Sequence, residues 1–277
     1  MSLGDAYCAE LRKLAISAVD TDAVLQVLTP IWQTKAETAS RIRGRIERVL
    51  DFATVKGWRT GENPARWRGH LKNALPARQK LTRGHHAAMP YAEVPAYVKR
   101  LQSAEAMAAR GLEFLILTAS RSGEVLGAKW PEVDLEAAVW TVPAERMKAG
   151  KEHRVPLTPR AVVIIEALQE TKVNDFIFPG ERKDAPLSSM AFAMLIRRMK
   201  VEQYTAHGFR SAFRDWAGDE TSFPRELAEA ALAHRVGDET ERAYRRSDAL
   251  DRRRKLMVAW MDFCLSSKNL LHLVKKG

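Results

Sequence analysis

Apolar residues recur at helical spacing through the first part of the chain. The clearest stretch is 38–56, in which Ile42, Ile46 and Leu50 lie on one side of a predicted amphipathic helix. Gly57 follows where a helix C-terminal cap is expected. Further helices are predicted at 9–18, at 22–28, and from Asn63 through Trp67 to Leu71. We therefore expect residues 1–75 to contain helices only.

The rest of the chain continues with helical stretches but contains one pair of strand-like segments. Residues 139–143 and 153–157 are the two best strand candidates, and the polar connection between them contains Gly150. Together they predict a β-hairpin with lysines at its tip. Helices are expected at 91–101, 104–119, 161–170, 190–199, 207–218, 225–233, 239–246 and 249–263. The predicted fold class is mainly α with a small β-sheet (α+β).

A change of pattern between the two parts predicts a domain boundary. Residues 76–83 lack periodicity and are rich in cations, which indicates an exposed basic linker. We expect a helical domain over 1–75, a linker over 76–89, a second domain over 90–264 and a C-terminal tail over 265–277.

Composition limits the class and the location of the protein. The longest apolar run, around Phe114–Ala119, is far shorter than the roughly 20 residues that a membrane span needs, so no membrane partner is expected. The two cysteines, Cys8 and Cys264, lie near opposite ends of the 277 residues. This favours reduced thiols in a cytoplasmic protein over a disulfide framework or a metal cluster.

The net charge of +11 indicates a polyanionic partner, and nucleic acid is favoured because no basic amphipathic membrane anchor stands out. Candidate DNA-contacting residues are Lys35, Arg41, Arg45, Arg48, Arg78, Lys80 and Arg83. An ordinary solvated helix face is the alternative for the arginines. The tryptophans interleaved with these cations are expected in the core, namely Trp32, Trp58 and Trp67.

The first candidate for chemistry is Arg121, which follows an apolar helix that is expected to end near Ser120. Ser122-Gly123 is expected to break the chain, and Glu124 to begin a new turn. A guanidinium held at such a junction can fork onto two phosphate oxygens, and Glu124 can brace it. A purely structural Arg–Glu pair is the alternative.

Two histidine motifs and a tyrosine follow. His207 and Arg210 are three residues apart and share a helix face, but Arg214 lies on nearly the same face, so spacing does not choose between the arginines. A histidine can exchange a proton near neutral pH. His234 ends an apolar stretch, and Tyr244 follows ten residues later among charged neighbours. Taken singly, such residues are more often a surface His–Arg pair, a capping histidine and an interfacial tyrosine.

The hairpin tip carries two lysines, Lys148 and Lys151, whose ammonium groups could enter a DNA groove. A solvated turn lysine is the alternative for either. In the order Arg, Lys, His-x-x-Arg, His, Tyr, these motifs resemble those of the tyrosine recombinase (phage integrase) family. The matching segments are 118–127, 146–157, 207–216, 232–234 and 243–248, and the likeness extends from about Trp32 to Cys264.

The resemblance implies a helical core-binding domain followed by the catalytic fold of that family. It implies a catalytic set of Arg121, Lys148, His207, Arg210, His234 and Tyr244, with Glu124 as an acidic support. Lys148 is preferred over Lys151 because it directly follows Arg146-Met147, where the family has its hairpin lysine.

The implied chemistry is strand cleavage through a protein–DNA bond. Tyr244 would attack the scissile phosphate to give a 3′-phosphotyrosine and a free 5′-hydroxyl, while His207 assists the tyrosine proton and Lys148 protonates the leaving oxygen. Arg121, Arg210 and His234 would stabilise the transition state. Cationic side chains then replace metal ions, so neither a metal nor another cofactor is expected.

The implied partners are double-stranded DNA with core-type attachment sites and further copies of the chain, as a homotetramer on DNA and a monomer in its absence. A host DNA-bending protein or an excision factor is a further candidate partner, and the expected location is the cytoplasm, at the bacterial nucleoid. The tail is expected either to dock on a neighbouring protomer or to pack on its own domain. Such integrases usually carry an N-terminal arm-binding domain, so we expect this sequence to be a fragment of an enzyme that integrates or excises a mobile element.

Two other functions fit some of the same features. A type IB topoisomerase shares the chemistry but relaxes supercoils without site preference. A DNA-binding module without catalysis, such as a repressor or a degenerate integrase, would share the charge but not need the complete set of catalytic residue types.

Overall fold

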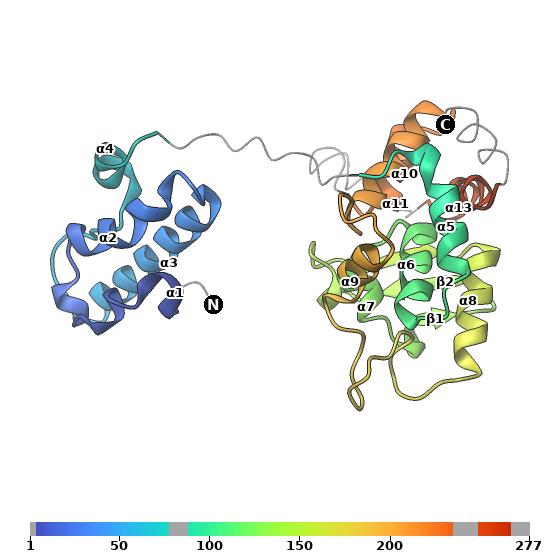
Figure 1. The fold of residues 1–277 in the computed structure, drawn as a ribbon, viewed down its shortest axis with the longest axis horizontal. Coiled ribbons are helices and arrows are strands. Elements are labelled where there is room, and N and C mark those ends of the chain that lie inside the picture. The colour runs from blue at the N-terminus through green and yellow to red at the C-terminus, as the bar shows by residue number, and fades with distance from the viewer. Residues whose placement is uncertain (1–3, 78–87, 235–248, 267–277) are drawn as a thin grey trace. The chain divides into compact units, whose positions relative to one another are not determined.

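The computed structural model describes residues 4–77, 88–234 and 249–266, and in these ranges the chain is mainly helical with one small antiparallel sheet, as expected (Figure 1). The chain divides into two compact units, Met1–Arg83 and Gly84–Gly277. The expected helix at 239–246 and most of the expected linker and tail lie outside the described residues. Among the described helices, none is long and apolar enough to cross a membrane.

The first unit packs two longer helices against each other and joins them with short turns. Its elements are α1 (Asp5–Cys8), two 3₁₀ turns (Leu11–Lys13 and Ile16–Ala18), α2 (Thr21–Trp32), α3 (Ala36–Val55), a kinked π segment (Trp67–Leu71) and α4 (Lys72–Ala74). Helix α2 begins after Asp20, whose carboxylate accepts a hydrogen bond from the Ala23 amide at 2.9 Å. Gly57, with φ of 72°, provides the left-handed residue that closes α3, which confirms the expected cap.

Two helix predictions for this unit are wrong. Residues 9–18 do not form one helix, because Leu14 and Ala15 are extended (ψ 144° and 142°) and separate two single 3₁₀ turns. No helix begins at Asn63, because its side-chain oxygen accepts from the Ala65 amide at 2.9 Å and forms a local turn instead. Gly69, with φ of 71°, then kinks the following segment.

Two of the three tryptophans expected in the core are packed there. Trp32 is buried and donates from Nε1 to the Pro76 carbonyl at 2.9 Å, and Trp67 packs on it with 5.3 Å between ring centroids. Trp58 is 59% exposed, so its expected core position is wrong. It follows the turn at Gly57 and lies edge-on against Phe52, itself exposed on the outer side of α3, at 5.8 Å.

The second unit surrounds one buried helix with further helices and a three-stranded sheet. Its helices are α5 (Val94–Gln102), α6 (Met107–Thr118), α7 (Ser122–Leu126), α8 (Pro159–Gln169), α9 (Ala191–Arg198), α10 (Gly208–Asp219), α11 (Arg225–Ala231) and α13 (Leu250–Leu265). The strands are β1 (Val133–Asp134), β2 (Val139–Val142) and β3 (His153–Pro156), in the order β1-β2-β3. Trp140 pairs with Val155 across the antiparallel β2–β3 hairpin, which confirms the expected hairpin.

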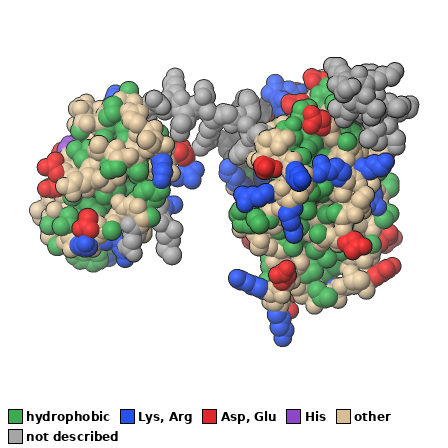
Figure 2. Space-filling model, in the orientation of Figure 1, with side chains coloured by type: hydrophobic (Ala, Val, Ile, Leu, Met, Phe, Trp, Pro, Cys, Tyr) green, Lys and Arg blue, Asp and Glu red, His purple; other side chains and the backbone are tan. Residues whose placement is uncertain are grey.

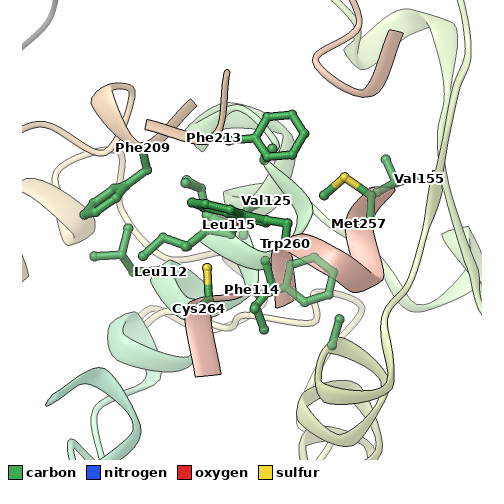
Figure 3. Close-up of a cluster of buried hydrophobic side chains, with 14 of the residues drawn as sticks. Leu112, Phe114, Leu115, Val125, Val155, Phe209, Phe213, Met257, Trp260 and Cys264 are labelled. Carbon is green, nitrogen blue, oxygen red and sulfur yellow. The ribbon is translucent and has the colours of Figure 1, made fainter. Parts of the chain in front are cut away.

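Helix α6 is the buried helix at the centre of this unit, and its residues from Gly111 onward are buried on every side. Figure 3 shows Leu112, Phe114 and Leu115 of α6 within the cluster that also contains Trp260 of α13 and Phe213 of α10. The Trp260 indole also donates to the Ile116 carbonyl at 2.8 Å. The end of α6, and the residues that follow it, are therefore held rigidly by the core.

Candidate active site

Arg121 stands at the junction that follows α6, as expected from the sequence. Ala119 adopts a left-handed conformation (φ 50°) that ends α6, and Arg121 is the N-cap residue of α7. The Glu124 carboxylate is 4% exposed and accepts from both the Arg121 amide and Arg121 Nη1, each at 2.8 Å. The expected bracing contact is thus present, and it leaves part of the Arg121 guanidinium accessible.

Arg210 of α10 lies beside Arg121 and is almost completely buried. Its Nη1 donates to the Ala119 carbonyl, and its Nη2 donates to the Leu232 carbonyl at 2.6 Å. Arg121 Nη2 lies 3.4 Å from the same Leu232 oxygen, so the two guanidiniums converge on one backbone carbonyl. Burial, and then the positive charge of Arg121, lower the pKa of Arg210 to about 10, which still leaves it charged at neutral pH.

His234 completes this cluster from the end of α11. Its Nε2 lies 3.2 Å from Arg210 Nη2, and its Nδ1 lies 2.6 Å from Oε2 of Glu229. The other carboxylate oxygen of Glu229 accepts from Nε of Arg214 at 2.6 Å. Arg210, rather than Arg214, therefore lies in the cluster with Arg121, while Arg214 forms a hydrogen bond to Glu229.

Glu229 was not among the residues predicted from the sequence. Burial raises its pKa, but hydrogen bonds from His234 and Arg214, together with their charges, outweigh burial and hold the pKa below its usual value. Its signal in the sequence is one carboxylate within the otherwise apolar run 227–232, a position where a charge needs a partner.

His153 of β3 is a second residue near the site that the sequence did not indicate. It shares a strand face with the buried Val155 and bonds to the backbone of Ala231 at the end of α11. Burial, followed by the charge of Arg253, lowers the pKa of His153 to about 4 despite the opposing charge of Glu124. The imidazole is therefore neutral at physiological pH.

The low pKa of His153 predicts a loss of stability in mild acid. The unfolded chain, with the ordinary pKa of 6.5, binds a proton more readily than the folded chain, whose pKa is about 4. The contribution of His153 to the free energy of unfolding is therefore fully present above pH 6.5 and is lost as the pH falls towards 4. Between pH 7 and pH 5 we expect His153 to lower the free energy of unfolding by about 1–2 kcal/mol.

Denaturant unfolding of the wild type and of His153→Gln at both pH values measures this effect. The variant should show a correspondingly weaker dependence on pH. An identical dependence in the two proteins would contradict a neutral, half-buried His153.

The hairpin loop that carries Lys148 is anchored close to Arg121. Arg146 donates to the Glu132 carboxylate and to the backbone carbonyl of Glu124, and Met147 is buried. Lys148 and Lys151 follow on the exposed part of the loop. The base of the loop is thus tied to the residue that braces Arg121, but the geometry does not choose between the two lysines.

His207 is the exposed N-cap residue of α10, one helical turn before Arg210. It lines a hollow of about 440 Å³ together with Ser122, the residue after Arg121, and with Ala193 and Arg197 of α9. His207 thus lies one helical turn from Arg210 and shares this hollow with the residue that follows Arg121. Tyr244 lies outside the described residues.

Three of the candidate DNA-contacting residues in the first unit lie on the outer surface of α3. Arg41, Arg45 and Arg48 are exposed, and Arg41 pairs with Glu37 at 2.9 Å. Lys35 precedes the helix, with its ammonium 5.4 Å from the ring centroid of Tyr7. Lys and Arg side chains are also prominent on the visible face of the second unit (Figure 2). The remaining candidates lie outside the described residues, namely Arg78, Lys80 and Arg83.

Within the described ranges, no group of three or more His, Cys, Asp or Glu side chains is placed to hold a metal ion. The cluster described above consists of cations and the carboxylates that position them.

Comparison with family models gives two matches. Residues 1–70 match the model described as "Phage integrase central domain" and residues 89–250 match "Phage integrase family".

Comparison with curated proteins gives relatives of greater length. The prophage integrase IntZ of Escherichia coli K12 is 32% identical over 91% of this chain and 61% of its own length. The integrase of Shigella phage Sf6 is 29% identical over 90% of this chain and 65% of its own length. The chain therefore spans less than two thirds of the length of these relatives.

Comparison with solved structures supports the fold. A lambda integrase (75–356) dimer bound to a COC′ core site matches with a TM-score of 0.60 and 18% identity, covering 83% of this chain and 86% of that one. The Tn1549 transposon integrase in complex with circular intermediate DNA matches with a TM-score of 0.55 and 12% identity, covering 84% of this chain and 87% of that one.

Proposed function

Because this chain belongs to the phage integrase family, whose model matches residues 89–250, we propose that it is part of a site-specific DNA recombinase that acts through a 3′-phosphotyrosine at Tyr244. The main support is the convergence of Arg121 and Arg210 on the Leu232 carbonyl, with His234 beside them. Two guanidiniums that meet at one oxygen, with an imidazole against one of them, are suited to the non-bridging oxygens of a phosphodiester.

In the proposed reaction, one phosphorus–oxygen ester bond of DNA is exchanged for one to tyrosine. The Tyr244 hydroxyl attacks phosphorus, the bond to the 5′ oxygen breaks, and Lys148 gives that oxygen a proton. A free tyrosine has a pKa of about 10, so the proton of the attacking hydroxyl needs an acceptor. We assign His207 to assist the transfer of this proton. Arg121, Arg210 and His234 stabilise the charge on the pentacoordinate phosphate. The energy of the broken bond remains in the phosphotyrosine, so religation needs no ATP.

The proposed substrate is double-stranded DNA with core-type sites. The exposed arginines of α3 support this, because Arg41, Arg45 and Arg48 offer cations along one surface to a phosphate backbone. We extend this role to Lys35 and to the linker cations, which are Arg78, Lys80 and Arg83. The function would be integration or excision of a mobile element in the cytoplasm, at the nucleoid.

The proposed assembly on DNA is a tetramer. A solved lambda integrase tetramer is bound to a Holliday junction, and it matches this chain with a TM-score of 0.58. A host DNA-bending protein and an excision factor are additional proposed partners.

A nicked suicide substrate tests the proposed activity. After cleavage, such a duplex loses the short fragment that carries the free 5′-hydroxyl. The covalent intermediate therefore accumulates and can be seen on a denaturing gel. We expect an adduct with core-site DNA from the ends of the element that encodes the chain. DNA binding without any adduct would overturn the proposal and favour a non-catalytic module. Relaxation of a plasmid that lacks the site would favour a topoisomerase.

Replacement of the hairpin lysine tests the proposed general acid. We expect Lys148→Ala to slow cleavage by about 10²–10⁴-fold, because the 5′ oxygen would then leave without a proton. The matched control is Lys151→Ala, on the same loop, which should cleave normally. A substrate with sulfur in place of the bridging 5′ oxygen should restore the Lys148→Ala rate, because a thiolate leaves without protonation. Slow cleavage by Lys151→Ala together with normal cleavage by Lys148→Ala would assign the role of general acid to Lys151.

A further inference from the structure

We infer that Glu229 is a positioning residue for His234. Its carboxylate holds the imidazole so that the Nδ1 proton points towards the carboxylate and Nε2 points towards the paired arginines. The inference rests on the proposed function only for what His234 then does to DNA. The contacts that join Arg210, His234, Glu229 and Arg214 lie within the protein itself.

Each carboxylate oxygen of Glu229 has its own hydrogen-bond partner. The residue lies on α11, five positions before His234, and its side chain is 10% exposed. Oε2 faces His234 Nδ1 at 2.6 Å, and Oε1 faces Arg214 Nε at 2.6 Å. Arg225, one helical turn earlier, is more distant, at 3.8 Å, and largely exposed. The carboxylate is therefore oriented by Arg214 and presents one oxygen to the histidine.

The hydrogen-bond partners determine which nitrogen of a neutral His234 carries the proton. A guanidinium only donates, so Nε2, 3.2 Å from Arg210 Nη2, has to accept. Nδ1 then carries the hydrogen and donates it to Glu229. When a phosphate oxygen approaches, Nε2 can donate to it only after the ring gains a second proton. The carboxylate 2.6 Å from Nδ1 stabilises that imidazolium against the charges of Arg210 and Arg121.

This arrangement also gives Arg214 a role that its position in the sequence left open. Arg210 and Arg214 are one turn apart on α10. The first reaches the Leu232 carbonyl and His234, and the second holds Glu229 behind the histidine. One helix thus supplies both a phosphate-facing cation and the anchor of the carboxylate.

Glu229→Gln should reverse the tautomer with little change in shape. Arg214 Nε donates, so the glutamine oxygen is expected to take the position of Oε1, and the amide NH₂ then faces His234 Nδ1. Two donors cannot share one hydrogen bond, so Nδ1 becomes the acceptor and the proton moves to Nε2. Nε2 would then face Arg210 as a second donor and lose that contact.

Nitrogen NMR of histidine-labelled protein, at a pH where the ring is neutral, measures the tautomer without DNA. His234 is assigned by its absence in His234→Gln. We expect the Nδ1–H form in the wild type and the Nε2–H form in Glu229→Gln. A wild-type ring in the Nε2–H form would overturn the inference, whether or not the variant folds. This result does not depend on whether the protein cleaves DNA.

Cleavage of the suicide substrate supplies the functional arm. We expect Glu229→Gln to slow adduct formation about 10²-fold, the usual effect of losing one preorganised donor, with DNA affinity unchanged. The matched control is Glu113→Gln, which removes another buried carboxylate that binds an arginine, Arg160, at 2.8 Å but has no histidine partner. Equal rates in the two variants would overturn the inference. Absence of adduct in the wild type would instead overturn the proposed function and leave the tautomer result standing.

Discussion

Tyr244→Phe is expected to abolish the covalent protein–DNA adduct completely while leaving DNA affinity unchanged. The substitution removes only the hydroxyl oxygen that we propose as the nucleophile, and no phenylalanine atom can replace it. The effect should therefore reach the detection limit of the denaturing gel. Binding, measured by gel shift at fixed salt, should remain within about twofold, because the arginines and lysines that contact phosphates are untouched.

Tyr204→Phe is the matched control for this experiment. Tyr204 lies in the same unit, lines the same hollow as His207, and donates to Glu93 at 3.3 Å. Loss of this hydroxyl should leave adduct formation intact. An adduct in Tyr244→Phe, or a similar loss in both variants, would show that the nucleophile is another group.

Arg121→Ala is expected to lower the cleavage rate by about 10²–10³-fold and the DNA affinity by only a few fold. The Arg121 guanidinium is one of two that meet at the Leu232 carbonyl, and we propose that their remaining N–H donors bind the scissile phosphate. A donor fixed in advance at a developing negative charge contributes more to the transition state than to the ground state. Single-turnover cleavage at saturating protein separates this rate effect from binding.

Arg160→Ala controls for the cost of breaking a partly buried ion pair. Arg121 is 24% exposed and pairs with the buried Glu124, and Arg160 is 32% exposed and pairs with the buried Glu113. Both variants should lose stability, but only Arg121→Ala should lose cleavage. If the affinity and the rate of Arg121→Ala fell by the same factor, Arg121 would be a DNA-binding residue without a role in the transition state.

Much of the fold followed from periodicity, and the failures have local causes. The stretch 38–56 has both an apolar stripe and a C-terminal glycine, and α3 formed there; the β2–β3 hairpin also formed where strand-like residues flank a polar connection. Helix spacing was misleading at 9–18, where the chain extends at Leu14. Strand β1 has only two residues, too few for any alternation to be recognised.

The candidate site was predictable where motif order and local context agreed, and not where distant elements meet. Arg121, Arg210 and His234 come from three separate helix ends, and the structure brings them together. Glu229 and His153 were missed because their importance arises from contacts between elements. No spacing rule indicates that β3 reaches the end of α11, where His153 bonds to Ala231.

The oxygens that hold the two guanidiniums have a consequence for how such a site can change during evolution. Among the described residues, the acceptors other than the Glu124 carboxylate and His234 Nε2 are the main-chain carbonyls of Ala119, Leu232 and Ala233, which every amino acid carries. Side chains at these positions can therefore drift without removing a ligand of either arginine. What the site requires instead is the path of the chain, which includes the left-handed turns at Ala119 (φ 50°) and Ala233 (φ 49°). Homologous sites could thus keep their geometry while the sequence around the arginines diverges.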